Sequence, residues 1–343
     1  MLAGHMVLQI LGSLAGLAVG AAAALYAAGP PLHQGVVEPL PITTNSIPMD
    51  LKYPARERIG RLVYRGGLEL RSPDRRFGGI SALLWEEACG RILAATDTGA
   101  WIALEPSEEA DRLTGITAAW IAPIRDERGR PAASKAQADA EALARKEDTV
   151  FVWFEQDHRV QRYEGLSACA PESLAAAASD VSRPQAMRSW PRNGGAEAVS
   201  LVGRDLLVLA EQAQAGDGTM DAFLWSPTTG TERPLAHRPP SGFQATGMDA
   251  VPGSDRQLIL YRRFTPLEGV SAIVAELRPD TSPIPGTVLE VTEIARFMPP
   301  LAVDNMEGIA VRHDGERLFL YLASDDNFNP LQRTLLLKFE LLP

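Results

Sequence analysis

The chain has few cysteines, few aromatic residues and a shortage of positive charge. Only two of its 343 residues are cysteines, Cys89 and Cys169, and neither cysteines nor histidines show the spacing of a zinc site or a redox motif. Aromatic residues make up 6% of a chain that is 45% hydrophobic and contains 29 glycines and 26 prolines. This balance favours many short strands joined by turns over a helical bundle. The two cysteines pair in an oxidising compartment or stay as free thiols; the sequence leaves both open.

Lysine and arginine number 33 against 43 acidic residues, which gives a formal net charge of −10 and a pI near 5.1. Such a surface repels the phosphates of nucleic acids, so we expect no DNA or RNA partner. The chain could still handle an anionic ligand if bound cations invert the local charge. The acidity also maintains solubility, with no further role required.

Several catalytic motifs are missing. The chain has no G-x-S-x-G nucleophile elbow, no Walker loop and no H-E-x-x-H zinc motif. These absences disfavour the common serine hydrolases, P-loop enzymes and zinc proteases.

The N-terminal segment has no charge over Val7–Ala28 and is rich in Leu, Ala, Gly and Val. This pattern predicts a signal peptide or a membrane anchor within residues 1–28. Residues 29–54 are Pro-rich and are interpreted as a tether, which leaves 55–343 as the folded body. We therefore expect a periplasmic or extracellular protein, with membrane attachment through residues 7–28 as one possibility.

A short phrase recurs five times in the body. The copies occupy residues 79–83, 139–143, 195–199, 247–251 and 305–309, and their central residues are Ser81, Glu141, Glu197, Asp249 and Glu307. These centres lie 52 to 60 positions apart, and four of the five are carboxylates. Each copy is followed by a turn, an apolar run and a polar end. Repeats of roughly this length are typical of propellers, solenoids and arrays.

The repeated unit predicts an all-β fold, a β-propeller with five blades, or six if one blade lacks the phrase. A double-sheet sandwich is the main alternative. The C-terminal strand at 335–339 is expected to pair with strands from residues 59–70 and close the ring. Two Ala-rich stretches conflict with strand structure. We interpret 133–138 as a short helix and 173–179 as a loop helix on the rim.

In a propeller the innermost strands line the central channel, so the phrase is expected to bring its carboxylates together there. Clustered carboxylates need protons or cations, and oxygen ligands without His or Cys favour Ca²⁺ or Mg²⁺. The predicted metal ligands are Asp97, Glu141, Glu197, Asp249, Asn305, Glu307 and Asp325. The alternative reading is that these acids cap turns at strand ends.

Two arginines, Arg262 and Arg263, interrupt the acidic pattern in the fourth repeat. They are predicted to bind a phosphate or carboxylate, together with Asn327, or else to pair with a neighbouring acid. Glu307, Asp325 and Arg263 are the predicted catalytic residues.

Several motifs resemble the phytase-like family of exported bacterial proteins, described as having esterase-like activity of phytase. The resemblance covers roughly residues 60–343 and rests on the segments 77–81, 95–99, 139–143, 247–248, 305–310, 324–328 and 332–334. It implies a β-propeller with phosphomonoesterase or esterase activity that depends on Ca²⁺. Its closing pair of motifs, around Glu307 and Asp325, is the most specific.

Three functions remain open at this point. The first is a metal-dependent phosphate-ester hydrolase that acts on a small anionic substrate as a monomer. The second is a non-catalytic propeller that binds a ligand or partner and uses the cation for structure. The third is a serine carboxylesterase with Ser81 as its nucleophile.

Overall fold

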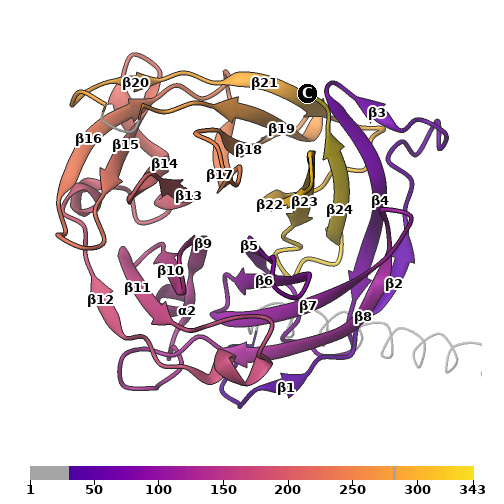
Figure 1. The fold of residues 1–343 in the computed structure, drawn as a ribbon, viewed down its shortest axis with the longest axis horizontal. Coiled ribbons are helices and arrows are strands. Elements are labelled where there is room, and N and C mark those ends of the chain that lie inside the picture. Colours follow the sequence, from indigo (N-terminus) through magenta and orange to yellow (C-terminus); the bar gives the residue numbers. More distant parts are fainter. Residues whose placement is uncertain (1–30, 281–282) are drawn as a thin grey trace, which may run out of the picture. The chain divides into compact units, whose positions relative to one another are not determined.

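The computed structural model describes residues 31–280 and 283–343, and the predicted segment at Val7–Ala28 lies outside these residues. Five sheets, antiparallel except for one short edge strand, are arranged around a central axis as the blades of a β-propeller (Figure 1). The predicted five-bladed fold is therefore confirmed. Among the described residues, no helix has both the length and the apolar character that crossing a membrane requires.

Each blade runs outward from an inner strand at the axis. The inner strands are β5 (Ile80–Glu86), β9 (Ala140–Lys146), β13 (Ala196–Val202), β17 (Gln244–Ala250) and β22 (Met306–Asp314). The second strands are β6 (Arg91–Thr96), β10 (Thr149–Phe154), β14 (Asp205–Gly216), β18 (Gln257–Thr265) and β23 (Arg317–Ser324). The third strands are β7 (Ala100–Glu109), β11 (Arg159–Glu164), β15 (Thr219–Trp225), β19 (Gly269–Leu277) and β24 (Thr334–Leu341). We number the blades 1 to 5 in this order.

The outer edges are less regular. The fourth strands are β8 (Arg112–Pro123), β12 (Asp180–Ser182), β16 (Glu232–His237), β21 (Thr292–Phe297) and β4 (Leu62–Arg71). Short flanking strands add to them: β1 (Glu38–Pro39), β2 (Thr43–Ser46), β3 (Arg58–Ile59) and the parallel β20 (Val288–Leu289). Blade 5 combines both ends of the described chain, because β24 pairs with β4 from Thr334 opposite Leu70 to Leu341 opposite Leu62. This confirms the predicted closure of the ring.

The core is divided among the interfaces between blades. Five hydrophobic clusters are present in the described residues, and each joins side chains of two neighbouring blades. Strands in the middle of a blade are therefore apolar on both faces, as in the second strand β10, where every residue after Thr149 is buried. Continuous apolar runs of this kind are what strands covered on both sides require.

The segment expected to be a tether is instead part of the propeller over residues 38–46. Its strand β1 pairs with β8 in blade 1, and β2 pairs with β4 in blade 5. The side chains of Leu40 and Met49 are 3% and 1% exposed, so this segment also contributes to the core. Its prolines did not prevent pairing because outer-edge strands need fewer backbone donors.

Two of the remaining local predictions can be compared with the structure. The helix α2 (Lys135–Ala138) lies within the expected 133–138, and the 3₁₀ helix η1 (Pro171–Ala175) overlaps the start of the expected loop helix. Cys89 and Cys169 form a disulfide with a Cα–Cα distance of 5.6 Å, which links blade 1 to the loop that follows β11 in blade 2. The chain thus has no free cysteine among its described residues.

Candidate functional site

The five inner strands share a β-bulge near their first residues, and this bulge defines the site. The pairing of inner and second strands shifts register at Ser81, Glu141, Glu197, Thr246 and Glu307. A bulge inserts an extra residue and re-aims its side chain. Four of the five phrase centres therefore occupy equivalent positions. In blade 4 the equivalent residue is Thr246, three positions before the predicted Asp249.

The two hydroxyl residues at the bulge join blades. Ser81 Oγ donates to the carbonyl oxygen of Ala140 at 2.6 Å, and Thr246 Oγ1 donates to that of Met306 at 2.9 Å. Both acceptors directly precede the bulged glutamate of the next blade. Ser81 is 1% exposed. Its hydroxyl is committed to a structural hydrogen bond, so the geometry gives no support to Ser81 as a nucleophile.

Asp249 lies away from the bulge, in the contact between blades 4 and 5. Its carboxylate accepts hydrogen bonds from the backbone N–H groups of Val311 at 2.7 Å and Ala250 at 2.8 Å. Burial raises the pKa of Asp249 to about 7 despite these two donors. The structure thus separates Asp249 from the other predicted metal ligands.

A second tier of polar residues lies opposite the residues that precede the bulges, at the end of the second strand in blades 1, 2 and 5 and within it in blades 3 and 4. It consists of Asp97, Glu155, Glu211, Arg262 and Asp325. In four blades the backbone N–H of this residue donates to the carbonyl oxygen two positions before the bulge, at 2.8–3.0 Å. The exception is Arg262, which is paired in register with Gln244 at the same place. The backbone therefore presents the same position in all five blades, and four of the five carry a carboxylate.

We use the name acid ring for the carboxylates of the two tiers together with Asp139, which precedes the bulge in blade 2. Its members are Asp97, Asp139, Glu141, Glu155, Glu197, Glu211, Glu307 and Asp325. Their mutual repulsion contributes to raised pKa values for Asp97, Glu141, Glu155, Glu197, Glu307 and Asp325, after burial as the first cause. Two cations lie among these eight acids, Lys135 from α2 and Arg262.

Lys135 neutralises the acid ring between blades 1 and 2. Its Nζ lies 2.8 Å from the carbonyl oxygen and 2.7 Å from Oδ2 of Asp97, and it also pairs with Asp139 Oδ1. Burial opposes the charge of Lys135, but the carboxylates around it raise its pKa overall. The side chain amide of Gln156 fixes the other oxygen of Asp139 at 2.6 Å.

Arg262 neutralises the opposite part of the acid ring. Its guanidinium donates to Asn305 Oδ1 at 2.5 Å, and it lies 3.3 Å from Glu211 Oε1 and 3.8 Å from Glu307 Oε1. Asn305 in turn donates from Nδ2 to Glu307 Oε1 at 2.7 Å. Arg262 and Asn305 thus hold one oxygen of Glu307, whose pKa burial raises to about 7.

The remaining acids of blades 2 and 3 have no such counterion. Two groups of three carboxylates each have one oxygen per residue within 4.8 Å of the others, Asp139–Glu141–Glu155 and Glu155–Glu197–Glu211. Glu155 belongs to both. Glu141, Glu155 and Glu197 form no salt bridge with any residue that the structure describes. The pKa values of Glu141 and Glu197 lie well above the ordinary range, because burial and neighbouring carboxylates disfavour their charge.

The other predicted residues divide into two groups. Asp325 is buried beside Glu307 and Asp97, and these neighbours add to the effect of burial in raising its pKa. Asp97 has a buried oxygen, Oδ1, without a hydrogen-bond partner among the described residues. By contrast, Arg263 pairs with Glu268 and lies over the ring of Phe243 at 4.8 Å. Successive side chains of a strand point to opposite sides, which is why Arg262 reaches the acid ring and Arg263 does not.

Asn327 is exposed, has a left-handed φ of 48°, and donates its backbone N–H to Asp325 Oδ1 at 2.6 Å. Asn327 therefore contacts the acid ring through its backbone N–H group.

The predicted ligand set missed Asp139, Glu155 and Glu211. A sequence feature marks each of them, because Asp139 opens its copy of the phrase, and Glu155 and Glu211 directly follow the apolar run of their repeats. No sequence feature indicated that Lys135 would contact these acids; the sequence placed it only in a short helix.

Below the acid ring the channel is filled. The space there is only about 10 Å³ and is lined by apolar side chains of the inner strands, among them Leu83, Leu143 and Ile309, with Glu197 and Glu307 at its edge.

The fold and this site define the class of the protein, a five-bladed β-propeller with a ring of carboxylates at one end of its axis. The family model described as "Phytase-like: Esterase-like activity of phytase" matches residues 75–328, which include the whole acid ring. The chain belongs to this family, and the resemblance seen in the sequence is confirmed. No curated protein gives a significant match to the chain.

Similar solved structures include the catalytic domain of the GH62 α-L-arabinofuranosidase of Coprinopsis cinerea, with a TM-score of 0.51 and 11% identity over 83% of this chain and 99% of that one. Another is the glutaminyl cyclase of Myxococcus xanthus, with a TM-score of 0.43 and 12% identity over 91% of this chain and 100% of that one. At these identities the similarity concerns the fold alone.

Proposed function

We propose that the acid ring binds divalent cations of the Ca²⁺ type at blades 2 and 3 and that the protein hydrolyses phosphate esters there. The observation that carries the proposal is the pair of carboxylate triplets that share Glu155, in which Glu141, Glu155 and Glu197 form no ion pair with any described residue. The family description, which names phytase, supports the choice of phosphate esters.

The donor set fits a hard cation. All five side chains of the two triplets offer carboxylate oxygens, and neither histidine nor cysteine takes part. Ca²⁺ takes six to eight oxygen ligands in a flexible geometry, whereas Mg²⁺ demands a near-ideal octahedron. Cations bound at such a site supply charge neutralisation for a phosphate and acidify a bound water.

The chain's own residues have separate roles in this proposal. Asp139, Glu141, Glu155, Glu197 and Glu211 hold the cations. Arg262 lies beside Glu211 and orients the substrate phosphate through its guanidinium. Glu307 accepts the proton of the attacking water, because Asn305 holds only its Oε1 and no described residue donates to Oε2.

The test is an assay of the full-length protein with p-nitrophenyl phosphate and phytate, with added Ca²⁺ and after removal of metal by a chelator. We expect turnover that depends on Ca²⁺ and is lost in Glu155→Gln and Glu307→Gln. The control is Glu316→Gln, because Glu316 is exposed and forms no hydrogen bond or ion pair among the described residues. Wild-type turnover that is equal to that of Glu307→Gln, with and without Ca²⁺, would contradict the catalytic proposal.

A second function is favoured by the filled channel below the acid ring. The cation then has a structural role and joins blades 2 and 3 of a propeller that binds a ligand or partner without catalysis. In that case Ca²⁺ at about 1,000 times its dissociation constant raises stability by about 4 kcal/mol. Both substrates remain intact.

The disulfide between Cys89 and Cys169 supports an exported protein, since such bonds persist in oxidising compartments. We propose a periplasmic or extracellular location, which fractionation of the source cells would test.

A further inference from the structure

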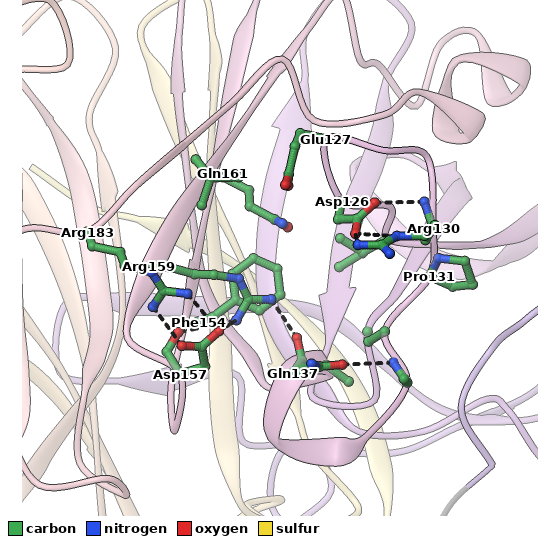
Figure 2. Close-up of a pocket in the computed structure, with 16 residues that line it drawn as sticks. Asp126, Glu127, Arg130, Pro131, Gln137, Phe154, Asp157, Arg159, Gln161 and Arg183 are labelled. Carbon is green, nitrogen blue, oxygen red and sulfur yellow. Dashed lines mark hydrogen bonds and ion pairs between the residues drawn. The ribbon is translucent and has the colours of Figure 1, made fainter.

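A polar pocket of about 370 Å³ is lined by residues of blades 1 and 2 and of the loops beside them, and none of these residues belongs to the acid ring (Figure 2). The loop that follows β8 forms one wall, the β10–β11 turn forms the other, and Ala138 of α2 lies between them. The helix α2 separates the two places, because its Lys135 reaches the acid ring while Gln137 and Ala138 line the pocket. The volume is within the range of small-molecule sites.

Both walls are held by ion pairs that involve only residues of the pocket. On one wall Arg130 donates two hydrogen bonds to Asp126 Oδ2, at 2.7 and 3.0 Å. On the other, Arg183 donates to both oxygens of Asp157, at 2.6 and 3.0 Å. Bidentate pairs of this kind fix side chain geometry before a ligand arrives, which reduces the entropy lost on binding.

The floor is also fixed. Arg159 is 8% exposed, lies 3.7 Å from the centre of the Phe154 ring, and donates to the carbonyl oxygen of Gln137 at 2.5 Å. The guanidinium thus covers the aromatic face and ties the β10–β11 turn to α2.

The charges of the lining cancel. Its basic residues are Arg130, Arg159 and Arg183, and its acidic residues are Asp126, Glu127 and Asp157. A phosphate or carboxylate ligand would meet as many negative groups as positive ones, and the arginines are already paired. The pocket therefore selects against the anions that Arg262 and metal-loaded carboxylates would attract.

Gln161 and Glu127 have groups that remain available to a ligand. The amide oxygen of Gln161 accepts from Tyr163 at 2.9 Å, while no described residue pairs with its amide nitrogen. Glu127 has only a 4.0 Å ion pair with Arg128. Figure 2 shows both side chains directed into the space between the walls. A donor beside an acceptor suits hydroxyl groups, which both donate and accept.

We infer that this pocket binds a neutral polyhydroxylated ligand, a sugar or polyol, through Gln161 and Glu127. The site is separate from the acid ring, and its occupancy requires no metal.

Ligand-observed NMR and calorimetry test this with glucose, xylose and myo-inositol as probes and inorganic phosphate as the anionic counterpart, using the full-length protein in a chelator. We expect saturable binding of at least one neutral probe with a dissociation constant below about 10 mM. Loss of one hydrogen-bonding group in Gln161→Leu or Glu127→Ala should weaken it about tenfold. The control Glu164→Gln changes an exposed acid outside the pocket and should leave binding unchanged.

Both variants are expected to fold. Tyr163 keeps its second acceptor, the carbonyl oxygen of Arg125, when Gln161 is replaced, and Glu127 is exposed. No saturable binding of any neutral probe up to about 50 mM would overturn the inference. Equal binding by wild type and both variants, or tighter binding of phosphate than of the sugars at this pocket, would also overturn it. Failure here leaves the Ca²⁺ titration of the acid ring unaffected, so the two proposals are tested separately.

Discussion

The acid ring has two unlike halves. In one half the chain provides its own cations, since Lys135 lies between Asp97 and Asp139 and Arg262 lies beside Glu211 and Glu307. In the other half, Glu141, Glu155 and Glu197 form no ion pair with any described residue, although Asp139 and Glu211 of the same triplets pair with Lys135 and Arg262. Equivalent backbone positions therefore hold carboxylates that are neutralised by a protein cation in one half and carboxylates that are not in the other. The half that is not neutralised is where an external cation is needed.

The largest effect is expected at Glu155, the residue common to both triplets. Replacing it in Glu155→Gln removes a negative ligand from each, so we expect a loss of at least about 100-fold in Ca²⁺ affinity. Titration calorimetry of metal-stripped protein measures this. Wild-type affinity in Glu155→Gln would show that the triplets are not the site.

Removal of Lys135 should make the half of the acid ring that has its own cations resemble the half that lacks them. In Lys135→Met, Asp97 and Asp139 lose their shared counterion, and breaking a partly buried pair costs about 1–3 kcal/mol in the absence of metal. We expect Ca²⁺ to restore much of this stability, because an ion can take the place of the ammonium group. Urea unfolding with Ca²⁺ and with chelator gives both values, and a loss that Ca²⁺ does not reduce would contradict the comparison.

The pH dependence of stability should differ with and without metal. Glu307 and Asp249 have folded pKa values of about 7, above the ordinary 4.5 and 3.8. The folded protein therefore holds protons that the unfolded chain releases, so this stability is present below about pH 4 and is lost as pH rises to about 7. In chelator we expect the melting temperature to fall between pH 5 and pH 8.

Ca²⁺ should remove the part of this fall that comes from the acid ring, because it stabilises the ionised carboxylates there. Asp249→Asn should reduce the fall in melting temperature by an amount that Ca²⁺ does not affect, since Asp249 lies in the contact between blades 4 and 5. An identical pH profile in wild type and Asp249→Asn would contradict this separation.

The smallest effect is expected from Arg263, the neighbour of Arg262. Arg263→Gln removes an exposed pair with Glu268 and should change stability by at most about 1 kcal/mol, with no effect on Ca²⁺ affinity. Arg262→Gln should change Ca²⁺ affinity, because its guanidinium lies 3.3 Å from Glu211. Equal Ca²⁺ affinity in the two variants would contradict the placement of Arg262 at the acid ring and of Arg263 on the opposite side of the strand.

Much of the fold could be predicted because it depends on patterns that recur along the chain. Apolar runs between turns identified the strands, and the repeat indicated five blades and the closing strand at residues 335–339. The register in blade 4 could not be predicted in this way. Gly247-Met248-Asp249 resembles the other copies, but the bulge falls at Thr246, whose hydroxyl bonds the next blade where blades 2, 3 and 5 present a glutamate.

The candidate site was predictable in part for a related reason. Repetition identified Glu141, Glu197 and Glu307, which occupy the same bulge. It could not show that Lys135, from a four-residue helix between two blades, would neutralise Asp97 and Asp139. Which acids remain without a counterion depends on contacts between blades, and these are absent from the pattern within one repeat.

The most direct test of the two-halves account is an anomalous-scattering map from crystals of the protein soaked in Mn²⁺, which occupies oxygen sites of the same kind. The account predicts peaks at the oxygens of Glu141, Glu155 and Glu197, within the two triplets, and none between Asp97 and Lys135 or between Arg262 and Glu307. Peaks confined to the Asp97–Lys135 or Arg262–Glu307 side, or no peak at the acid ring at all, would contradict it.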